Sequence, residues 1–170
     1  MSRKRTAMLA GFIAGMMFAV LAAQPAAAQS VLSEKQISLP LAQEAATAAV
    51  EHCRKDGYKV TVTVVDRAGR VKVVLRDDGT GPHTLDTSRR KAYTSLSFRT
   101  STAEFAKRIA TNPAAAGLKD VDGVITLGGG LPILSGAEVI GAIGVGGAPG
   151  GDKDEACAQA GINKIAEKLK

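Results

Sequence analysis

The apolar positions between residues 124 and 147 fall into three short runs that are separated by glycine-rich turns. These runs are 124–127, 131–134 and 139–145. Their β-branched residues and bounding glycines predict three strands, the last two of which form a hairpin. Small residues in the third run, such as Ala142 and Gly144, leave room for another element to pack closely on one face of the sheet.

The pattern earlier in the chain predicts a second hairpin and a set of helices. Residues 59–66 alternate and then become apolar, and a second apolar run at 71–76 follows a short turn. Apolar residues at spacings of three and four predict helices elsewhere. The first predicted helix begins at Ser33 or Pro40 and ends at residue 55. Thr84 or Asp86 caps the second, which ends near 98. The third spans 102–111, and the last begins at Asp152 and ends at 169.

The order of these elements predicts the fold class. A helix, two strands, two helices, three strands and a final helix follow one another, and hairpins dominate the strand connections. This order favours an α+β fold, with helices on an antiparallel sheet, over a doubly wound parallel fold. The sequence shows neither an internal repeat nor a second domain.

The first 28 residues have the pattern of a secretory signal peptide. A basic head at residues 2–5 precedes an uncharged apolar run at 7–23, and Ala26-Ala27-Ala28 then offers a cleavage site before Gln29. The alternative is a retained membrane anchor, but the run is just short of a comfortable membrane span. We therefore expect a periplasmic or secreted domain over residues 29–170, with no stable membrane anchor after cleavage.

Removal of the leader also changes the charge balance. The chain has 22 basic and 16 acidic residues, and three of the basic residues lie in the predicted signal peptide. The mature chain therefore has 19 basic and 16 acidic residues and a net charge of +3. Tryptophan is absent and aromatic residues are few. This composition gives no reason to expect nucleic acid as a partner.

The glycine-rich turns do not match a nucleotide-binding motif. A phosphate loop requires a Lys-Ser/Thr pair, and none follows Gly130. A dinucleotide fingerprint that starts at Gly144 would need a third glycine where the chain has Pro149. The carboxylates of Asp152 and Asp154 at the start of the last helix would repel a phosphate there. Tight turns are the simpler interpretation.

Several segments together resemble the GlcG/HbpS family of haem-binding proteins, of the DUF336 type. The segments are 65–69, 76–79, 90–94, 129–133, 136–145 and 154–161. The resemblance covers nearly all of the mature chain. It implies a five-stranded antiparallel sheet flanked by helices, in a two-layer sandwich like that of profilin or PAS domains. It also implies homo-oligomers and haem as the cofactor, and haem degradation has been ascribed to some members.

The segment from Arg76 to Tyr93 has the groups that such a binder requires. His83 is the candidate iron ligand, and His52 and Tyr93 are alternatives. The candidate cations for the haem propionates are Arg76, Arg89, Arg90 and Lys91. Consecutive positions diverge around a helix, so we expect a cleft that is shared between subunits. Without haem, His83 would be an ordinary solvated loop residue.

The remaining chemistry leaves two questions open. Cys53 and Cys157 could form a disulfide in an oxidising compartment or remain as buried free thiols. The chain lacks the histidine and cysteine clusters of a zinc site. We therefore predict an exported haem-binding protein that sequesters, carries or senses haem, rather than an enzyme. The alternatives are a protein that acts on a small organic acid, held by Arg76 and the turn at 128–130, and a structural oligomer with no ligand.

Overall fold

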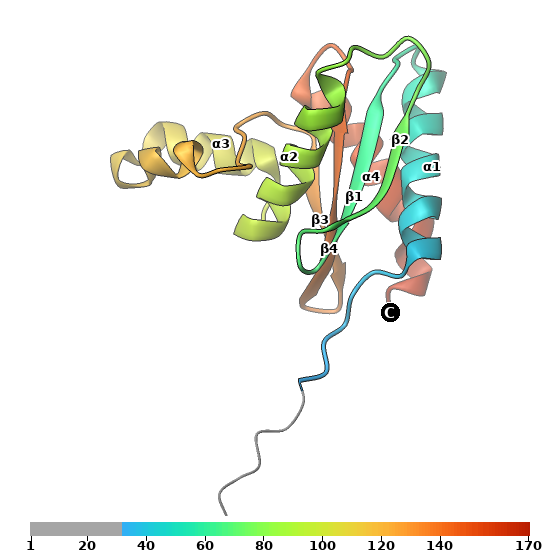
Figure 1. Ribbon diagram of the computed structural model, residues 1–170, viewed down its shortest axis with the longest axis horizontal. Coiled ribbons are helices and arrows are strands. Elements are labelled where there is room, and N and C mark those ends of the chain that lie inside the picture. Colours follow the sequence, from blue (N-terminus) through green and yellow to red (C-terminus); the bar gives the residue numbers. More distant parts are fainter. Residues whose placement is uncertain (1–31) are drawn as a thin grey trace, which may run out of the picture. The chain divides into compact units, whose positions relative to one another are not determined.

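The computed structural model describes residues 32–170, of which Glu34–Lys170 form one compact unit (Figure 1). The predicted signal peptide and its cleavage site lie outside the described residues. Among residues 32–170, none of the helices combines the length and the apolar character that crossing a membrane requires.

Helices and pairs of strands follow one another along the chain much as the sequence predicts. The elements are α1 (Leu39–Lys55), β1 (Thr61–Asp66), β2 (Val71–Arg76), α2 (Thr84–Phe98), α3 (Thr102–Thr111), the 3-10 helix η1 (Pro113–Asp120), β3 (Gly130–Ser135), β4 (Glu138–Gly146), α4 (Gly151–Ile165) and the short 3-10 helix η2 (Ala166–Lys168).

The four strands form one antiparallel sheet in the order β2-β1-β4-β3. Both predicted hairpins, β1–β2 and β3–β4, are confirmed. The prediction of a fifth strand at residues 124–127 is wrong, because side chains of α2 bond the backbone there. The Ile125 amide donates to Thr94 Oγ1 at 2.9 Å, and the Val124 carbonyl accepts from the Arg90 guanidinium. The segment is therefore tied to a helix and does not pair with a neighbouring strand.

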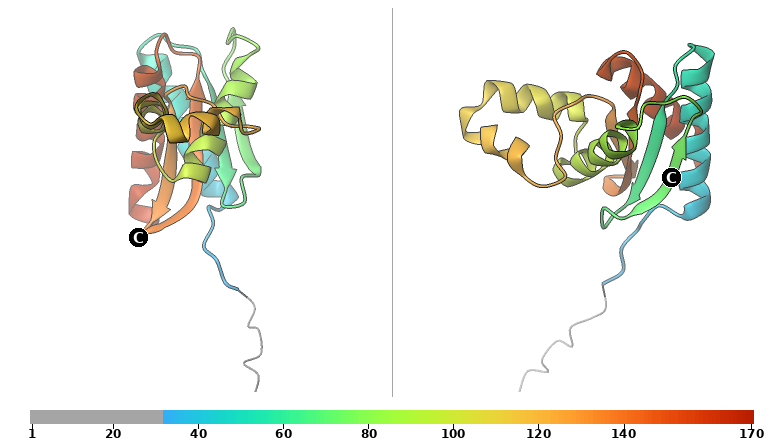
Figure 2. Two further views of the ribbon diagram at one scale, coloured as in Figure 1. Left: turned by 90° about the vertical axis from the view of Figure 1, so that its left-hand side faces the viewer. Right: turned by 45° about the horizontal axis from the view of Figure 1, so that its top comes forward.

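Helices pack on both faces of the sheet, so the predicted two-layer sandwich is also wrong. Helices α1 and α4 cover one face and α2 covers the other (Figures 1 and 2). The alternation of side chains in β1 follows this arrangement. Val62 and Val64 belong to the apolar core beneath α1 and α4, whereas Thr61 and Thr63 point to α2.

Small buried residues of α1 and α4, such as Ala45, Ala49 and Gly161, let the two helices lie close together. A Cβ atom at Gly161 of α4 would lie 2.5 Å from the carbonyl oxygen of Ala45 in α1. A disulfide joins Cys53 to Cys157, with 5.6 Å between the Cα atoms. Of the two cysteine states that the sequence left open, the structure has the bridged one. This bond links the last turns of α1 to the first turns of α4.

The opposite face of the sheet is unusually polar for an interior. Thr61 bonds Thr84 at 2.7 Å and Thr63 bonds Ser88 at 2.8 Å, and these four side chains are buried. The α2 backbone lies against Gly144, where an added Cβ would be 2.5 Å from the Ala92 amide nitrogen and closer still to a carbonyl oxygen. The prediction of a close approach at this glycine is confirmed.

Three helix starts differ from the predicted ones. Ser38, not Ser33, caps α1, and its hydroxyl accepts from the Leu41 amide at 3.4 Å. His83 occupies the cap position of α2, without a side-chain capping bond. Helix α4 begins at Gly151, one residue before the predicted start. Pro40 thus marks the start of α1 better than Ser33 does.

Substitution of Gly144 by alanine should destabilise the protein by about 1–3 kcal/mol, because the new methyl group overlaps the α2 backbone and forces the helix away from the sheet. The matched control is Gly117→Ala, since an added Cβ there meets no atom within 4 Å. The control should leave the free energy of unfolding in urea unchanged or slightly raised. Equal effects of the two substitutions would contradict the packing described here.

Candidate functional site

A cavity of about 300 Å³ lies between the first turns of α2, the end of β4 and the start of α4. The side chains and glycines that shape it are His83, Thr87, Lys91, Gly146, Gly151 and Asp154. We call it the His83 cavity. It combines an imidazole, a buried ion pair and walls of backbone, so a ligand could approach the main chain closely.

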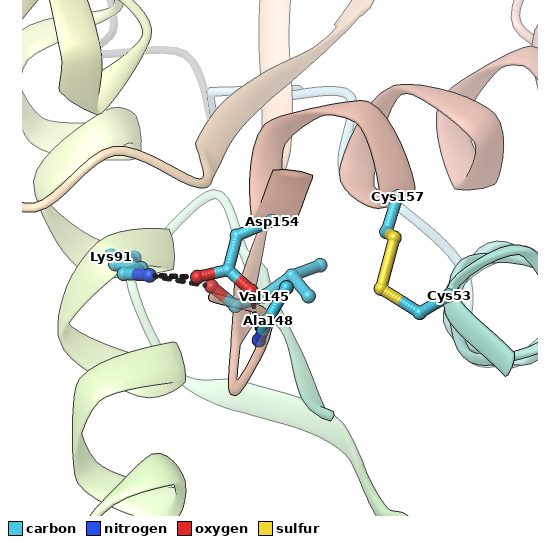
Figure 3. The surroundings of a disulfide bond; sticks show 6 residues. All are labelled: Cys53, Lys91, Val145, Ala148, Asp154 and Cys157. Carbon is cyan, nitrogen blue, oxygen red and sulfur yellow. Dashed lines mark hydrogen bonds and ion pairs between the residues drawn. A yellow bond between two sulfur atoms is a disulfide. The ribbon is translucent and has the colours of Figure 1, made fainter. Parts of the chain in front are cut away.

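Lys91 and Asp154, which both line the His83 cavity, form an ion pair (Figure 3). Lys91 Nζ lies 2.7 Å from Asp154 Oδ2 and donates to the Val145 carbonyl at 2.9 Å, and both side chains are 5% exposed. The other oxygen of Asp154 accepts from the Ala148 amide at 3.0 Å. Burial raises the pKa of the Asp154 carboxyl, and the Lys91 ammonium opposes that rise.

The glycine turn before β3 makes space for this pair. A Cβ at Gly129 would lie 2.6 Å from Asp154 Cβ and 3.1 Å from Lys91 Nζ, and its φ of +116° is unfavourable for other residues. Helix α4 also carries Cys157, one turn after Asp154. The start of α4 is thus bonded to α2 through the carboxylate and to α1 through the disulfide (Figure 3).

His83 presents an exposed imidazole at the rim of the cavity. Its ring lies against Gly81, where a Cβ would be only 2.7 Å from His83 Cε1. The imidazole makes no hydrogen bond or ion pair with any side chain or backbone group of residues 32–170. Both ring nitrogens are therefore available to a ligand, since no protein partner fixes the tautomer.

The predicted propionate cations do not gather at one point. Arg89 pairs with Asp86 at 3.0 Å, and Arg90 lies 3.7 Å from the same carboxylate. Arg76 donates to the Thr80 carbonyl and lines another depression, beside α1. Lys91 is committed to Asp154, so a contact with a propionate would require the buried pair to open.

The two alternative iron ligands lie away from the His83 cavity. His52 is half-buried on α1, which packs on the opposite face of the sheet from α2. Tyr93 lines a separate cavity near the other end of α2. Of the seven predicted site residues, the structure brings His83 and Lys91 to one cavity; the haem-binding role of all seven stays a prediction. No cluster of three or more His, Cys, Asp or Glu side chains suited to a metal occurs within residues 32–170.

Two contributors to the His83 cavity, Thr87 and Asp154, were not predicted from the sequence. Thr87 had no predicted role, and Asp154 was considered only as a carboxylate that would repel phosphate. The signal that could have found Asp154 is its place in the first turn of a helix after a glycine-rich turn, where a carboxylate can accept bonds from nearby amides. Its partnership with Lys91, 63 residues earlier, depends on tertiary packing.

Comparison with known families identifies the chain's relatives. The family model described as "Haem degrading protein HbpS-like" matches residues 37–163. The chain belongs to this HbpS-like family. A crystal structure of a double mutant of Streptomyces reticuli HbpS is 44% identical, with a TM-score of 0.76, and the match covers 84% of this chain and 97% of that one.

Two further proteins are similar to this chain. The crystal structure of a PduOC:heme complex is 28% identical, with a TM-score of 0.70, and the match covers 76% of this chain and 95% of that one. An uncharacterised 15.0 kDa protein from the dhaT-dhaS intergenic region of Citrobacter freundii is 31% identical over 113 residues, which are 65% of this chain and 80% of the relative. The family membership that the sequence predicts is therefore confirmed.

Removal of one partner of the Lys91–Asp154 pair should cost about 3–5 kcal/mol of unfolding free energy, because the other charge is left buried and unpaired. We expect this loss for Lys91→Met and for Asp154→Leu in urea unfolding. The double variant should lose much less than the sum of the two losses. The exposed pair of Lys107 with Glu104 supplies the control, since Lys107→Met should change stability little. Additive losses would refute the coupling.

Proposed function

We propose that the mature chain is an exported haem-binding protein in which His83 ligates the haem iron. The observation that carries the proposal is the exposed, unengaged imidazole at the rim of a cavity in an HbpS-like chain. A relative with a similar fold has been solved as a heme complex, which supports haem as the ligand class. When bound, haem would supply an iron centre that can take a further ligand or an electron.

The residues around the His83 cavity fit a haem that lies across its rim. A cavity of about 300 Å³ is at the small end for ligand pockets, so one chain would not enclose a large disc. Leu127, which lines the cavity, is 51% exposed, and Leu85 in the first turn of α2 is 47% exposed. These apolar side chains can cover part of one face of the disc, while His83 holds the iron.

The open side of the cavity supports a shared site in a homo-oligomer. The face of the haem away from His83 would be exposed to water unless a second subunit covered it. Arg89 and Arg90 are the most accessible cations along α2, and they share the single carboxylate of Asp86. We propose that they bind the propionates, in the same chain or across the subunit contact.

The small-acid hypothesis receives less support from the geometry. It requires Arg76 to meet the glycine turn at 128–130 around one carboxylate. Arg76 lines the depression beside α1, whereas Gly128 lines the His83 cavity. The two groups line different hollows, and a ligand that needs both finds no shared space there.

Hemin titration of the purified protein tests the proposal. The wild type should give a saturable Soret band. His83→Ala should shift its maximum and weaken binding at least tenfold, which corresponds to about 1.4 kcal/mol for a lost ligand. His52→Ala is the matched control, because it removes the other histidine from the opposite side of the sheet, and it should leave spectrum and affinity unchanged.

Two outcomes of this titration would contradict the proposal. An unchanged spectrum and affinity in His83→Ala would exclude His83 as the ligand and move the test to His52 and Tyr93. The absence of any saturable Soret change in the wild type would exclude haem itself.

Export has a separate test in the intact mass of the protein from its native host. We expect a chain that starts near Gln29 and whose mass is lower by two hydrogens than that of the dithiol, because Cys53 and Cys157 are bridged in an oxidising compartment. Recovery of intact Met1 from the cytoplasm would refute export. Two titratable thiols in the exported, denatured protein would refute the bridge.

A further inference from the structure

A second cavity, of about 410 Å³, lies at the end of α2 opposite to His83. It is bordered by the last turns of α2 and by the β1–β2 and β3–β4 turns. These two turns lie at the same end of the sheet (Figure 1). The side chains that matter here are Arg67, Tyr93, Leu96, Arg99, Glu138 and Val139. We call it the Tyr93 cavity. It shares no lining residue with the His83 cavity.

Two glycines hold the Tyr93 ring in place. A Cβ at Gly69 would lie 3.2 Å from Cδ2 and Cε2 of the ring, and one at Gly123 would lie 3.2 Å from Cδ1 on the other edge. Both glycines have φ near +80°, so the turns that carry them are shaped for glycine. The ring is therefore confined between two stretches of backbone and forms a fixed wall of the cavity.

Arg99 has a left-handed backbone conformation that residues other than glycine rarely adopt. It ends α2 with φ 52° and ψ 38°, and it is the only non-glycine residue of 32–170 with positive φ. Helices commonly place glycine there, because any Cβ is strained in this region. Arg99 forms no ion pair with residues 32–170. An arginine at a strained backbone position, with an unpaired guanidinium on a cavity wall, points to a role for its side chain.

Arg67 brings a second guanidinium to the same cavity. It lies 3.4 Å from Glu138 and 3.4 Å from Glu34, and its side chain is 32% exposed. Glu138 also lines the cavity. The lining side chains thus comprise two cations and one anion. Glu138 and Glu34 both compete with a ligand for Arg67, whereas Arg99 has no ion-pair partner among residues 32–170, so the cavity suits a ligand with a single negative charge.

We propose that the Tyr93 cavity binds a small monocarboxylic acid with an apolar body. The carboxylate would lie between the guanidinium groups of Arg67 and Arg99, whose planar donors suit it. The apolar body would pack on Tyr93, Leu96 and Val139. This site is separate from haem binding, and it places an organic acid at different residues from those that the sequence indicated.

Calorimetric titration with benzoate tests the site in the purified protein. The wild type should bind benzoate saturably and should not bind benzamide, which has the same shape without the charge. Arg99→Ala and Arg67→Ala should each weaken benzoate binding at least tenfold. Glu138→Gln should strengthen it several-fold, because the competing carboxylate is removed. Arg70→Ala is the matched control, since this exposed arginine of the same turn does not line the cavity.

A second variant at position 99 separates the side chain from the backbone. Arg99→Gly should lose benzoate binding as Arg99→Ala does, yet its thermal midpoint should be higher than that of Arg99→Ala by a few degrees, because glycine relieves the strain. His83→Ala should leave benzoate binding unchanged, which distinguishes this site from the haem proposal. The inference is overturned if benzoate does not bind, or if its affinity is the same in Arg67→Ala, Arg99→Ala and the wild type.

Discussion

The buried ion pair between Lys91 and Asp154 is the contact on which the arrangement around the His83 cavity depends. Two charges removed from water are tolerated only when their geometry is good and their remaining bonding capacity is used. The Val145 carbonyl and the Ala148 amide meet that requirement. Because the pair joins α2 to α4, it holds the helix that follows His83 against the glycine-rich start of α4.

The two faces of the sheet differ in the chemistry of their buried side chains. Beneath α1 and α4, alanine, valine and isoleucine side chains form an apolar core, and the disulfide of Cys53 and Cys157 holds the two helices together. Beneath α2, buried hydroxyls of threonine and serine lie beside a small apolar cluster of Val65, Ala92 and Ala142, and both cavities open along this helix. A polar layer of this kind is sensitive to any loss of a hydrogen-bond partner. It therefore fixes α2 in one position, and the ends of α2 position His83 and Arg99.

The local pattern of apolar, polar and small residues predicted much of the fold. Its predictions failed where tertiary contacts determine the structure of a segment. The two hairpins and the close approach at Gly144 followed from strand periodicity and small residues. Residues 124–127 have the composition of a strand, but Thr94 bonds the backbone there, which no local pattern reveals. Arg89, Arg90 and Lys91 are three adjacent cations in the sequence, and only packing shows that Lys91 turns inward to Asp154. The strained backbone of Arg99 has no sequence signature either.

The crystal structure of the protein with hemin is the most direct test of the central claim, which is that His83 ligates haem at the rim of its cavity. We expect an imidazole nitrogen of His83 bonded to iron, with the Lys91–Asp154 pair intact beside it. Haem ligated by His52 or Tyr93, or bound with His83 free in solvent, would contradict this assignment.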